Sequence, residues 1–130
     1  VLIGDGDVAG VIAVTDEDTT IDLYMGQGGA PEGVLAASAL KCVGGFFQGR
    51  LVFRNDDERE RARRTGVTDF DRKYDLHELV SKDAIFAATG VTKGAMLDGV
   101  KVADGFVSTH TLVMDSSTRT VQRIRTIRPL

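Results

Sequence analysis

A glycine-rich stretch, Gly-Gln-Gly-Gly-Ala-Pro-Glu-Gly at residues 26–33, constrains the fold of this chain more than any other sequence feature. The residues before it, 21–25, alternate apolar and polar side chains and predict a β-strand. The residues after it, 34–43, are strong helix formers with an apolar stripe, so they predict a helix. Pro31 suits the first turn of that helix, and the paired glycines 44–45 can end it. We therefore expect strand, glycine-rich loop and helix in succession.

This arrangement has a chemical consequence, because the first N–H groups of a helix have no internal partner and lie at the positive end of its dipole. An anion such as phosphate binds there favourably, and glycines let the backbone approach it closely. Glu32 lies in the same turn. Its carboxylate has two explanations, favourable interaction with the helix dipole or coordination of a metal ion, and the residues alone favour the first.

Two nucleotide-binding motifs are excluded at this loop. A dinucleotide fingerprint requires a third glycine where this chain has Pro31. A Walker loop requires Lys and Ser or Thr where the chain has Val34 and Leu35. Another phosphate-bearing ligand remains possible.

The composition, 42% hydrophobic and 27% charged over 130 residues, predicts one soluble domain spanning residues 1–130. A net charge of −3 gives no reason to expect nucleic acid as a partner. Cys42 is the single cysteine; it suits a reducing compartment and, within an apolar helix, the core. No apolar run approaches the roughly 20 residues that span a bilayer, so we expect no membrane association and a cytoplasmic location. The chain opens abruptly on an apolar run without an initiator methionine, which suggests a cut within a longer chain.

The first twenty residues predict a strand at 1–3 and then a short buried element at 8–14. Asp7 could cap a helix there, although so short an apolar run could equally be a buried strand. The acidic loop 15–20 is tempting as a metal site, but adjacent carboxylates in a loop are usually solvated surface.

The middle of the chain predicts a strand at 46–53 and two capped helices. Asn55 can cap a solvated, highly charged helix at 56–65 that ends at Gly66, and Asp75 with Glu78 resembles a capping box for a helix at 76–80. His77 has no second ligand at helical spacing, which makes a metal role there improbable.

Three further strands complete the expected fold. Residues 84–89 are continuously apolar, which is typical of a strand in a sheet covered on both faces, and the loop 90–94 follows its carboxyl end, where α/β sheets bind ligands. Residues 106–114 and 120–127 alternate around a polar turn at 115–118 and predict an antiparallel hairpin, with His110 in a structural role. Together these elements predict an α/β domain with a mixed sheet flanked by helices.

Five segments in register carry a family resemblance: Asp5-Gly6-Asp7-Val8-Ala9, residues 28–35, 41–45, 48–51 and 86–92. They resemble the carboxyl-terminal part of class II fructose-1,6-bisphosphatases. The resemblance implies a lithium-sensitive sugar-phosphatase fold, layered α/β/α/β/α, of which this chain is the carboxyl-terminal half. It also implies hydrolysis of the 1-phosphate of fructose 1,6-bisphosphate with Mg²⁺ or Mn²⁺, as in gluconeogenesis.

The resemblance also assigns roles to particular residues. It implies that Asp5, Gly6, Asp7 and Gly29 bind substrate and that Glu32 is a metal ligand. The family's catalytic threonine, its other acidic metal ligands and its phosphate-binding lysine lie upstream, so we expect no catalytic residue in this chain and no activity from it alone. Lys93 departs from the family pattern, which has an acidic or polar residue there.

Three hypotheses follow for the function. The first is the carboxyl-terminal part of a metal-dependent sugar bisphosphatase, with its missing N-terminal half as partner and a homo-oligomer as the assembly. The second is a sugar-phosphate-binding or regulatory module without catalysis. The third is an α/β domain whose glycine-rich loop serves packing alone. Acidic metal ligands encoded before Val1 would decide for the first.

Overall fold

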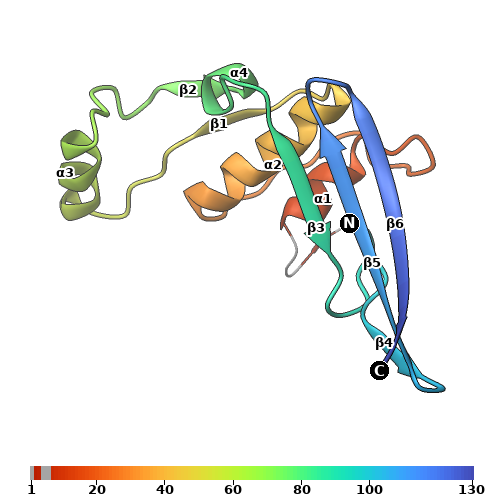
Figure 1. The fold of residues 1–130 in the computed structure, drawn as a ribbon. Coiled ribbons are helices and arrows are strands. Elements are labelled where there is room, and N and C mark those ends of the chain that lie inside the picture. The colour runs from red at the N-terminus through yellow and green to blue at the C-terminus, as the bar shows by residue number, and fades with distance from the viewer. Residues whose placement is uncertain (1, 4–6) are drawn as a thin grey trace.

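The computed structural model describes residues 2–3 and 7–130, and Figure 1 shows their arrangement. Within these residues, two helices come first, short strands and helices then alternate, and a run of strands ends the chain. In order they are α1 (Asp7–Ala13), α2 (Ala30–Val43), β1 (Gln48–Arg50), α3 (Asp56–Arg64), β2 (Lys73–Asp75), α4 (Leu76–Leu79), β3 (Ile85–Thr89), β4 (Lys101–Ala103), β5 (Phe106–Asp115) and β6 (Thr120–Pro129). The predicted α/β class with a helix-flanked sheet is confirmed, and the strand pairings of the described residues are antiparallel.

The main sheet is organised around β5. One edge of β5 pairs along its whole length with β6, and its other edge pairs with β4 and then β3. Leu112 of β5, for example, lies opposite Arg123 of β6 and Ala88 of β3. The predicted hairpin is therefore confirmed. In its turn, the Asp115 carboxylate accepts hydrogen bonds from the hydroxyl and the N–H of Ser117, at 2.7 and 2.8 Å, and these bonds lower the pKa of Asp115.

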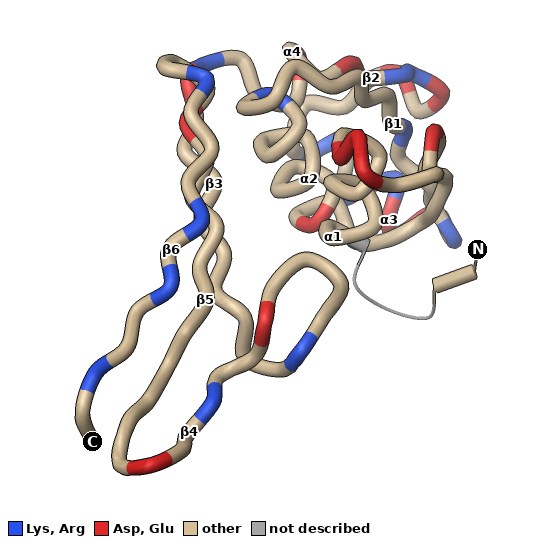
Figure 2. Tube along the Cα trace, turned by 90° about the vertical axis from the view of Figure 1, so that its right-hand side faces the viewer, with Lys and Arg blue, Asp and Glu red and all other residues tan. Residues whose placement is uncertain are grey.

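Helices α1 and α2 lie against one face of this sheet, and in Figure 2 all the helices stand on the same side of the strands. Directly paired residues share a face, so Leu112, Met114 and Phe86 all point toward α2 and bury their side chains there. Ala39 and Cys42 of α2 complete this core cluster. Burial of each large apolar side chain contributes about 1.5–3 kcal/mol, so this contact is a main source of stability.

The opposite face of β3 is not covered, which corrects one prediction. The apolar run 84–89 indicated a strand covered on both faces, yet Ile85 is 69% exposed while its neighbour Phe86 is only 6% exposed. Among the described residues, no helix packs on the side to which Ile85 points. The prediction is wrong for this chain because the second layer that such a strand requires is not formed by it.

Of the two forms that residues 8–14 allowed, the helix is confirmed. Gly10 of α1 permits a close contact: a Cβ atom there would lie 2.8 Å from Ile3 Cδ1 and 2.9 Å from Tyr24 Cε2. The Tyr24 ring thus packs on α1 and also borders the core cluster formed by Val11 and Leu40. Asp7 is the first helical residue, and its side chain lies outside the described part of the structure.

Three predicted strands are wrong or too long. Residues 21–25 are irregular, and Leu23 and Met25 are 72% and 82% exposed, because no described strand lies beside this segment to accept its backbone hydrogen bonds. Leu2 and Ile3 also have no regular structure, and Val1 lies outside the described residues. The strand predicted at 46–53 shortens to β1 (Gln48–Arg50), since its partner β2 offers only three residues for pairing.

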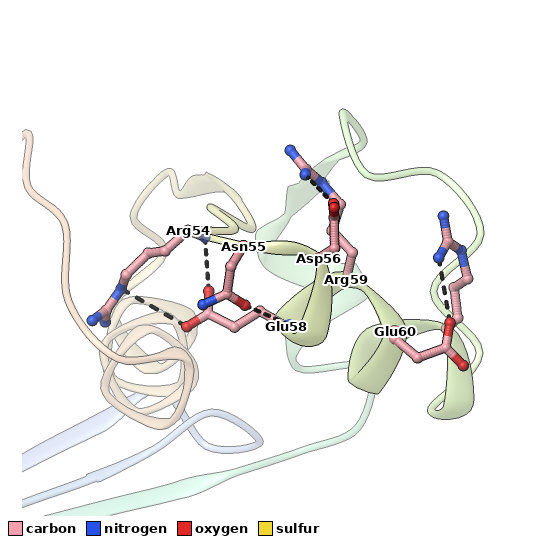
Figure 3. A network of polar contacts seen from close by, with 7 residues as sticks. Arg54, Asn55, Asp56, Glu58, Arg59 and Glu60 are labelled. Carbon is pink, nitrogen blue, oxygen red and sulfur yellow. Dashed lines mark hydrogen bonds and ion pairs between the residues drawn. The ribbon is translucent and has the colours of Figure 1, made fainter.

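Helix α3 stands away from the rest of the chain, beyond the β1–β2 ribbon (Figure 1). Its cap is as predicted: the Asn55 side chain accepts a hydrogen bond from the Glu58 N–H at 2.9 Å, and Glu58 accepts one from the Arg54 N–H at 2.8 Å. Ion pairs such as Asp56–Arg59, at 2.9 Å, continue this network along the helix (Figure 3). No residue of α3 is buried, so the predicted solvated helix is confirmed.

The capping box of α4 is confirmed as well. The Asp75 carboxylate accepts from the Glu78 N–H at 3.0 Å, and the Glu78 carboxylate accepts from the Asp75 N–H at 2.9 Å. Lys41 of α2 holds the following segment, because its Nζ donates to the carbonyls of Val80 and Lys82 at 2.7 and 2.8 Å. The start of β3 is thereby fixed to α2.

A search of the described helices for one long and apolar enough to cross a membrane finds none.

Candidate functional site

The candidate site begins where α2 begins. Gly29 is the N-cap residue, with an extended backbone (φ −69°, ψ 151°), and Pro31 follows in the first turn. The Gly33 N–H donates to the Gly29 carbonyl at 3.1 Å and closes that turn. The predicted loop-to-helix element is therefore confirmed, and at such a start the N–H groups ahead of Gly33 face outward, available to an anion. Gly44, with φ of 82°, ends the helix as predicted.

The structure brings Gly29 and Glu32 together. A Cβ atom at Gly29 would collide with the Glu32 carboxylate and would lie 3.2 Å from its Cδ. The Glu32 side chain therefore folds back over the N-cap residue, and an added Cβ at Gly29 would make the end of this flexible side chain shift. Both residues are exposed, so the carboxylate oxygens can reach a ligand from solvent. Two explanations fit this geometry, a carboxylate that stabilises the helix start or a carboxylate that holds a cation beside a phosphate.

The other predicted substrate-binding residues cannot be placed against this corner. Asp5 and Gly6 lie outside the described residues, and of Asp7 only the backbone, at the start of α1, is described. Helix α1 does pack with α2, and its Val8 and Ile12 lie against the core cluster to which Ala39 and Cys42 belong. The roles of Asp5, Gly6 and Asp7 stay predictions.

A complete metal centre is not formed by the described residues, which contain no group of three or more His, Cys, Asp or Glu side chains that could hold an ion. Glu32 offers one carboxylate, whereas Mg²⁺ takes six oxygen ligands, several of them water. The acidic residues of the loop 15–20 are exposed, and the Asp16 carboxylate there accepts a hydrogen bond from the Asp18 N–H at 3.0 Å. This loop is solvated surface, as predicted.

The loop after β3 is held by a polar cluster that the sequence did not predict. The Asp98 N–H donates to His110 Nδ1 at 3.1 Å, and the Asp98 carboxylate accepts from Arg125 at 2.7 Å. The Arg125 hydrogen bond, followed by the charge of Lys101, lowers the pKa of Asp98. His110 is thus structural, as expected. The sequence carries no local signal for this cluster, because its members meet only through the register of β5 with β6 and the path of the loop that carries Asp98.

Two glycines close the same loop. The Gly90 N–H donates to the His110 carbonyl at 3.0 Å, and a Cβ atom at Gly99 would lie 2.7 Å from the backbone of Thr92 and Lys93. The backbone segments are in contact there, so the loop is compact rather than open at the carboxyl end of β3. His77 and Lys93 are both exposed.

Cys42 belongs to the core and not to the site. It is 1% exposed, its thiol donates to the Ser38 carbonyl at 3.2 Å, and burial raises its pKa. A thiol buried in this way packs in the core and is not accessible to a substrate, which agrees with the predicted core role.

Comparison with known proteins identifies the family. The sequence model described as bacterial fructose-1,6-bisphosphatase, glpX-encoded, matches residues 1–128. The chain belongs to this family. The resemblance carried by the five segments is therefore confirmed.

Relatives with a curated function support the same assignment. The chain is 39% identical over 139 aligned residues to the D-fructose 1,6-bisphosphatase class 2/sedoheptulose 1,7-bisphosphatase of Synechococcus elongatus (strain ATCC 33912 / PCC 7942 / FACHB-805), with 97% of this chain and 40% of the relative aligned. It is 38% identical to the protein of the same name from Synechococcus sp. (strain JA-3-3Ab), with the same coverage. The chain thus spans about two-fifths of the length of these relatives.

Proposed function

We propose that this chain is the carboxyl-terminal part of a longer metal-dependent phosphatase that hydrolyses fructose 1,6-bisphosphate to fructose 6-phosphate and phosphate. The observation that carries this proposal is the family match over residues 1–128, in which Gly29 and Glu32 lie together at the start of α2. The names of the relatives extend the proposal to sedoheptulose 1,7-bisphosphate as a second substrate.

The substrate side of the proposed site consists of Asp5, Gly6, Asp7 and Gly29. Carboxylates accept hydrogen bonds from sugar hydroxyls, and the backbone of Gly29 leaves room for a phosphate to approach the free N–H groups of α2. The extended backbone of Gly29 directs the chain into the helix at this point. The two aspartates would hold the sugar while α2 orients the phosphate.

Glu32 is the proposed metal ligand, for Mg²⁺ or Mn²⁺. Its exposed carboxylate supplies the oxygen atoms that hard divalent cations prefer, and its position over Gly29 keeps these oxygens beside the phosphate end of α2. A bound divalent cation supplies Lewis-acid polarisation of the phosphate and stabilises charge on its oxygens. The further ligands and the catalytic groups are assigned to the remainder of the polypeptide, so no catalytic residue is proposed in this chain.

The 130-residue chain alone is proposed to be inactive, since one carboxylate cannot hold a hydrated Mg²⁺ ion firmly. We further propose that residues 1–130 form one domain of a homo-oligomeric, cytoplasmic enzyme of gluconeogenesis. Release of phosphate from fructose 1,6-bisphosphate by the isolated chain would contradict the first of these statements.

The alternative function is a sugar-phosphate-binding or regulatory module without catalysis. The favourable anion site at α2 would serve this role equally well. The longer polypeptide distinguishes the two: a module binds fructose 1,6-bisphosphate without releasing phosphate from it, whereas the proposed enzyme turns it over.

The test measures phosphate release by the longer polypeptide as Mn²⁺ is titrated. Glu32→Gln keeps the size of the side chain and removes its charge, so the Mn²⁺ concentration for half-maximal activity should rise at least about tenfold, or activity should be lost. Glu17→Gln, in the exposed acidic loop, is the matched control and should leave the titration unchanged. An unchanged titration for Glu32→Gln would leave Glu32 as a helix-start residue only.

A further inference from the structure

Helix α3 has one side that rests on its own neighbouring loops and one side that faces outward. The helix stands at the end of the β1–β2 ribbon, away from the main sheet and from α2 (Figure 1). No other described helix or strand packs extensively against it. On its inner side the Arg63 guanidinium lies 4.9 Å from the centre of the Phe70 ring, and the centre of that ring lies 5.0 Å from the centre of the Phe53 ring. These contacts anchor α3 and leave its opposite side to a partner.

The outward side of α3 carries four charged residues in a regular order. Their spacing of i, i+3, i+4 and i+7 places them in one stripe along the helix, and all four are exposed: Asp57, Glu60, Arg61 and Arg64. Together with Asn55 they line one groove. We call the four residues the charged stripe. From the N-terminal end of the helix, the stripe consists of two acids followed by two bases.

Ion pairs within the helix do not use all of these charges. Glu60 pairs with Arg63 and Arg64, at 3.4 and 3.5 Å. Asp57 and Arg61 lie one turn apart, yet neither forms an ion pair within the described part of the chain. The helix dipole explains why acids precede bases along the axis, but it does not require them to lie on the exposed side. The charged stripe therefore suits a partner with the complementary pattern.

We infer that the charged stripe is a contact between two copies of this chain, paired antiparallel about a two-fold axis. The order of two acids and two bases is its own complement when one copy is reversed. Asp57 of each copy then lies opposite Arg64 of the other copy. In the same register, Glu60 lies opposite Arg61. Such a contact uses the same patch on both copies, as two-fold interfaces do. The inference rests on the homo-oligomeric state in the proposed function and is independent of the proposed catalysis.

A second copy fits the stripe better than a partner of one charge sign. A wholly acidic surface, or a nucleic acid, would attract the basic half of the stripe and repel the acidic half. Exposed ion pairs are individually weak, so the stripe determines the register and the choice of partner more than the affinity. The attraction is also screened by salt, so the contact should weaken as the ionic strength rises.

Charge reversal in the longer polypeptide tests the contact. Asp57→Arg with Glu60→Arg makes the stripe wholly basic, and Arg61→Glu with Arg64→Glu makes it wholly acidic. Neither of these single-sign variants can pair with itself. Sedimentation at low salt, without metal or substrate, should give each one a dissociation constant for self-association at least about tenfold above that of the wild type. An equimolar mixture of the two should recover the wild-type constant, because a basic stripe then meets an acidic one.

The matched control lies in the exposed acidic loop. Glu17→Arg with Asp18→Arg changes the net charge by the same amount as the wholly basic stripe does. It should leave self-association unchanged. Recovery on mixing also separates the contact from damage to the fold, since two misfolded variants do not restore each other's association.

Three results would overturn the inference. The first is a wild-type polypeptide that stays monomeric. The second is self-association of the single-sign variants at the wild-type constant, which would assign the stripe to solvent or to another part of the same polypeptide. The third is weakened association that mixing does not restore. None of these measurements involves phosphate release, so recovery on mixing in an inactive polypeptide would remove the proposed catalysis and leave this inference standing.

Discussion

Two glycines at the start of α2, Gly29 and Gly33, give different predictions when each is replaced by alanine in the longer polypeptide. A Cβ atom at Gly29 would collide with the Glu32 carboxylate, so Gly29→Ala should push that carboxylate out of its position. A Cβ atom at Gly33 meets nothing within 4 Å, and the Gly33 N–H is already bonded within the helix. Gly33→Ala is therefore a control one helical turn away.

The expected magnitudes follow from the backbone. Gly29 has φ of −69° and ψ of 151°, which alanine adopts without strain. Loss of a glycine cap costs roughly 0.5–1 kcal/mol, and the lower entropy of the unfolded chain returns a similar amount, so the free energy of unfolding should change by less than about 1 kcal/mol. Gly33→Ala should stabilise the helix by about 0.5–1 kcal/mol and raise Tm by roughly 1–4 °C.

The assay combines thermal unfolding with phosphate release from fructose 1,6-bisphosphate as Mn²⁺ is titrated. Gly29→Ala should retain its Tm within a few degrees yet need at least about tenfold more Mn²⁺, because the displaced carboxylate no longer reaches the ion. Gly33→Ala should keep the wild-type titration. Wild-type Mn²⁺ dependence in Gly29→Ala would refute the argument that this contact positions Glu32 for function.

Three further predictions concern stability and use the 130-residue chain. Leu112→Ala should lower the free energy of unfolding in urea by about 2–5 kcal/mol, since Leu112 is 1% exposed between α2 and the sheet; a loss below 1 kcal/mol would mean that this core is not formed. Hydrogen bonds from the Asp75 N–H and then from Arg72 lower the pKa of Glu78 from its ordinary 4.5. The ionised Glu78 carboxylate therefore stabilises the fold above pH 4.5, and this stabilisation is lost as the pH falls. Below pH 4.5 the urea midpoint should therefore fall more steeply in wild type than in Glu78→Gln, and parallel curves would contradict the assignment. Gly105→Ala should cost about 1–2 kcal/mol in the same assay, because Gly105 has φ of 76°, and no loss would argue against this turn.

The sequence predicted those elements whose determinants are local. The caps of α3 and α4 depend on side chains within one helical turn, so Asn55, Asp75 and Glu78 could be assigned their partners before the structure was known. Gly44 at the end of α2 is another local signal. The long hairpin was equally readable, because β5 and β6 are adjacent in sequence.

Elements that depend on distant partners were predicted less well. The alternation at 21–25 is typical of a strand, yet a strand forms only beside another strand, and none of the described ones adjoins it. Strand β4 was missed although Asp104 and Gly105, both with positive φ, form a two-residue turn that an Asp-Gly pair favours. That signal was present and could have predicted the short hairpin of β4 with β5.

The candidate site likewise contains contacts that local sequence predicts and contacts that it does not. The proximity of Gly29 and Glu32 follows from their spacing across one helical turn and was predictable. The contact of Asp98 with Arg125, 27 residues apart, depends on the register of the sheet and on the path of the loop after β3, neither of which a local pattern determines. The arrangement of Asp5 and Asp7 around Glu32 likewise depends on tertiary contacts and stays a prediction.

The most direct measurement of the central claim is a crystal structure of the longer polypeptide grown with Mn²⁺ and fructose 1,6-bisphosphate, with the ion located by its anomalous scattering. The account predicts an anomalous peak about 2.1 Å from a Glu32 carboxylate oxygen, with a phosphate of the sugar at the start of α2 near Gly29. Manganese bound only to other carboxylates, with Glu32 in contact with solvent alone, would contradict it.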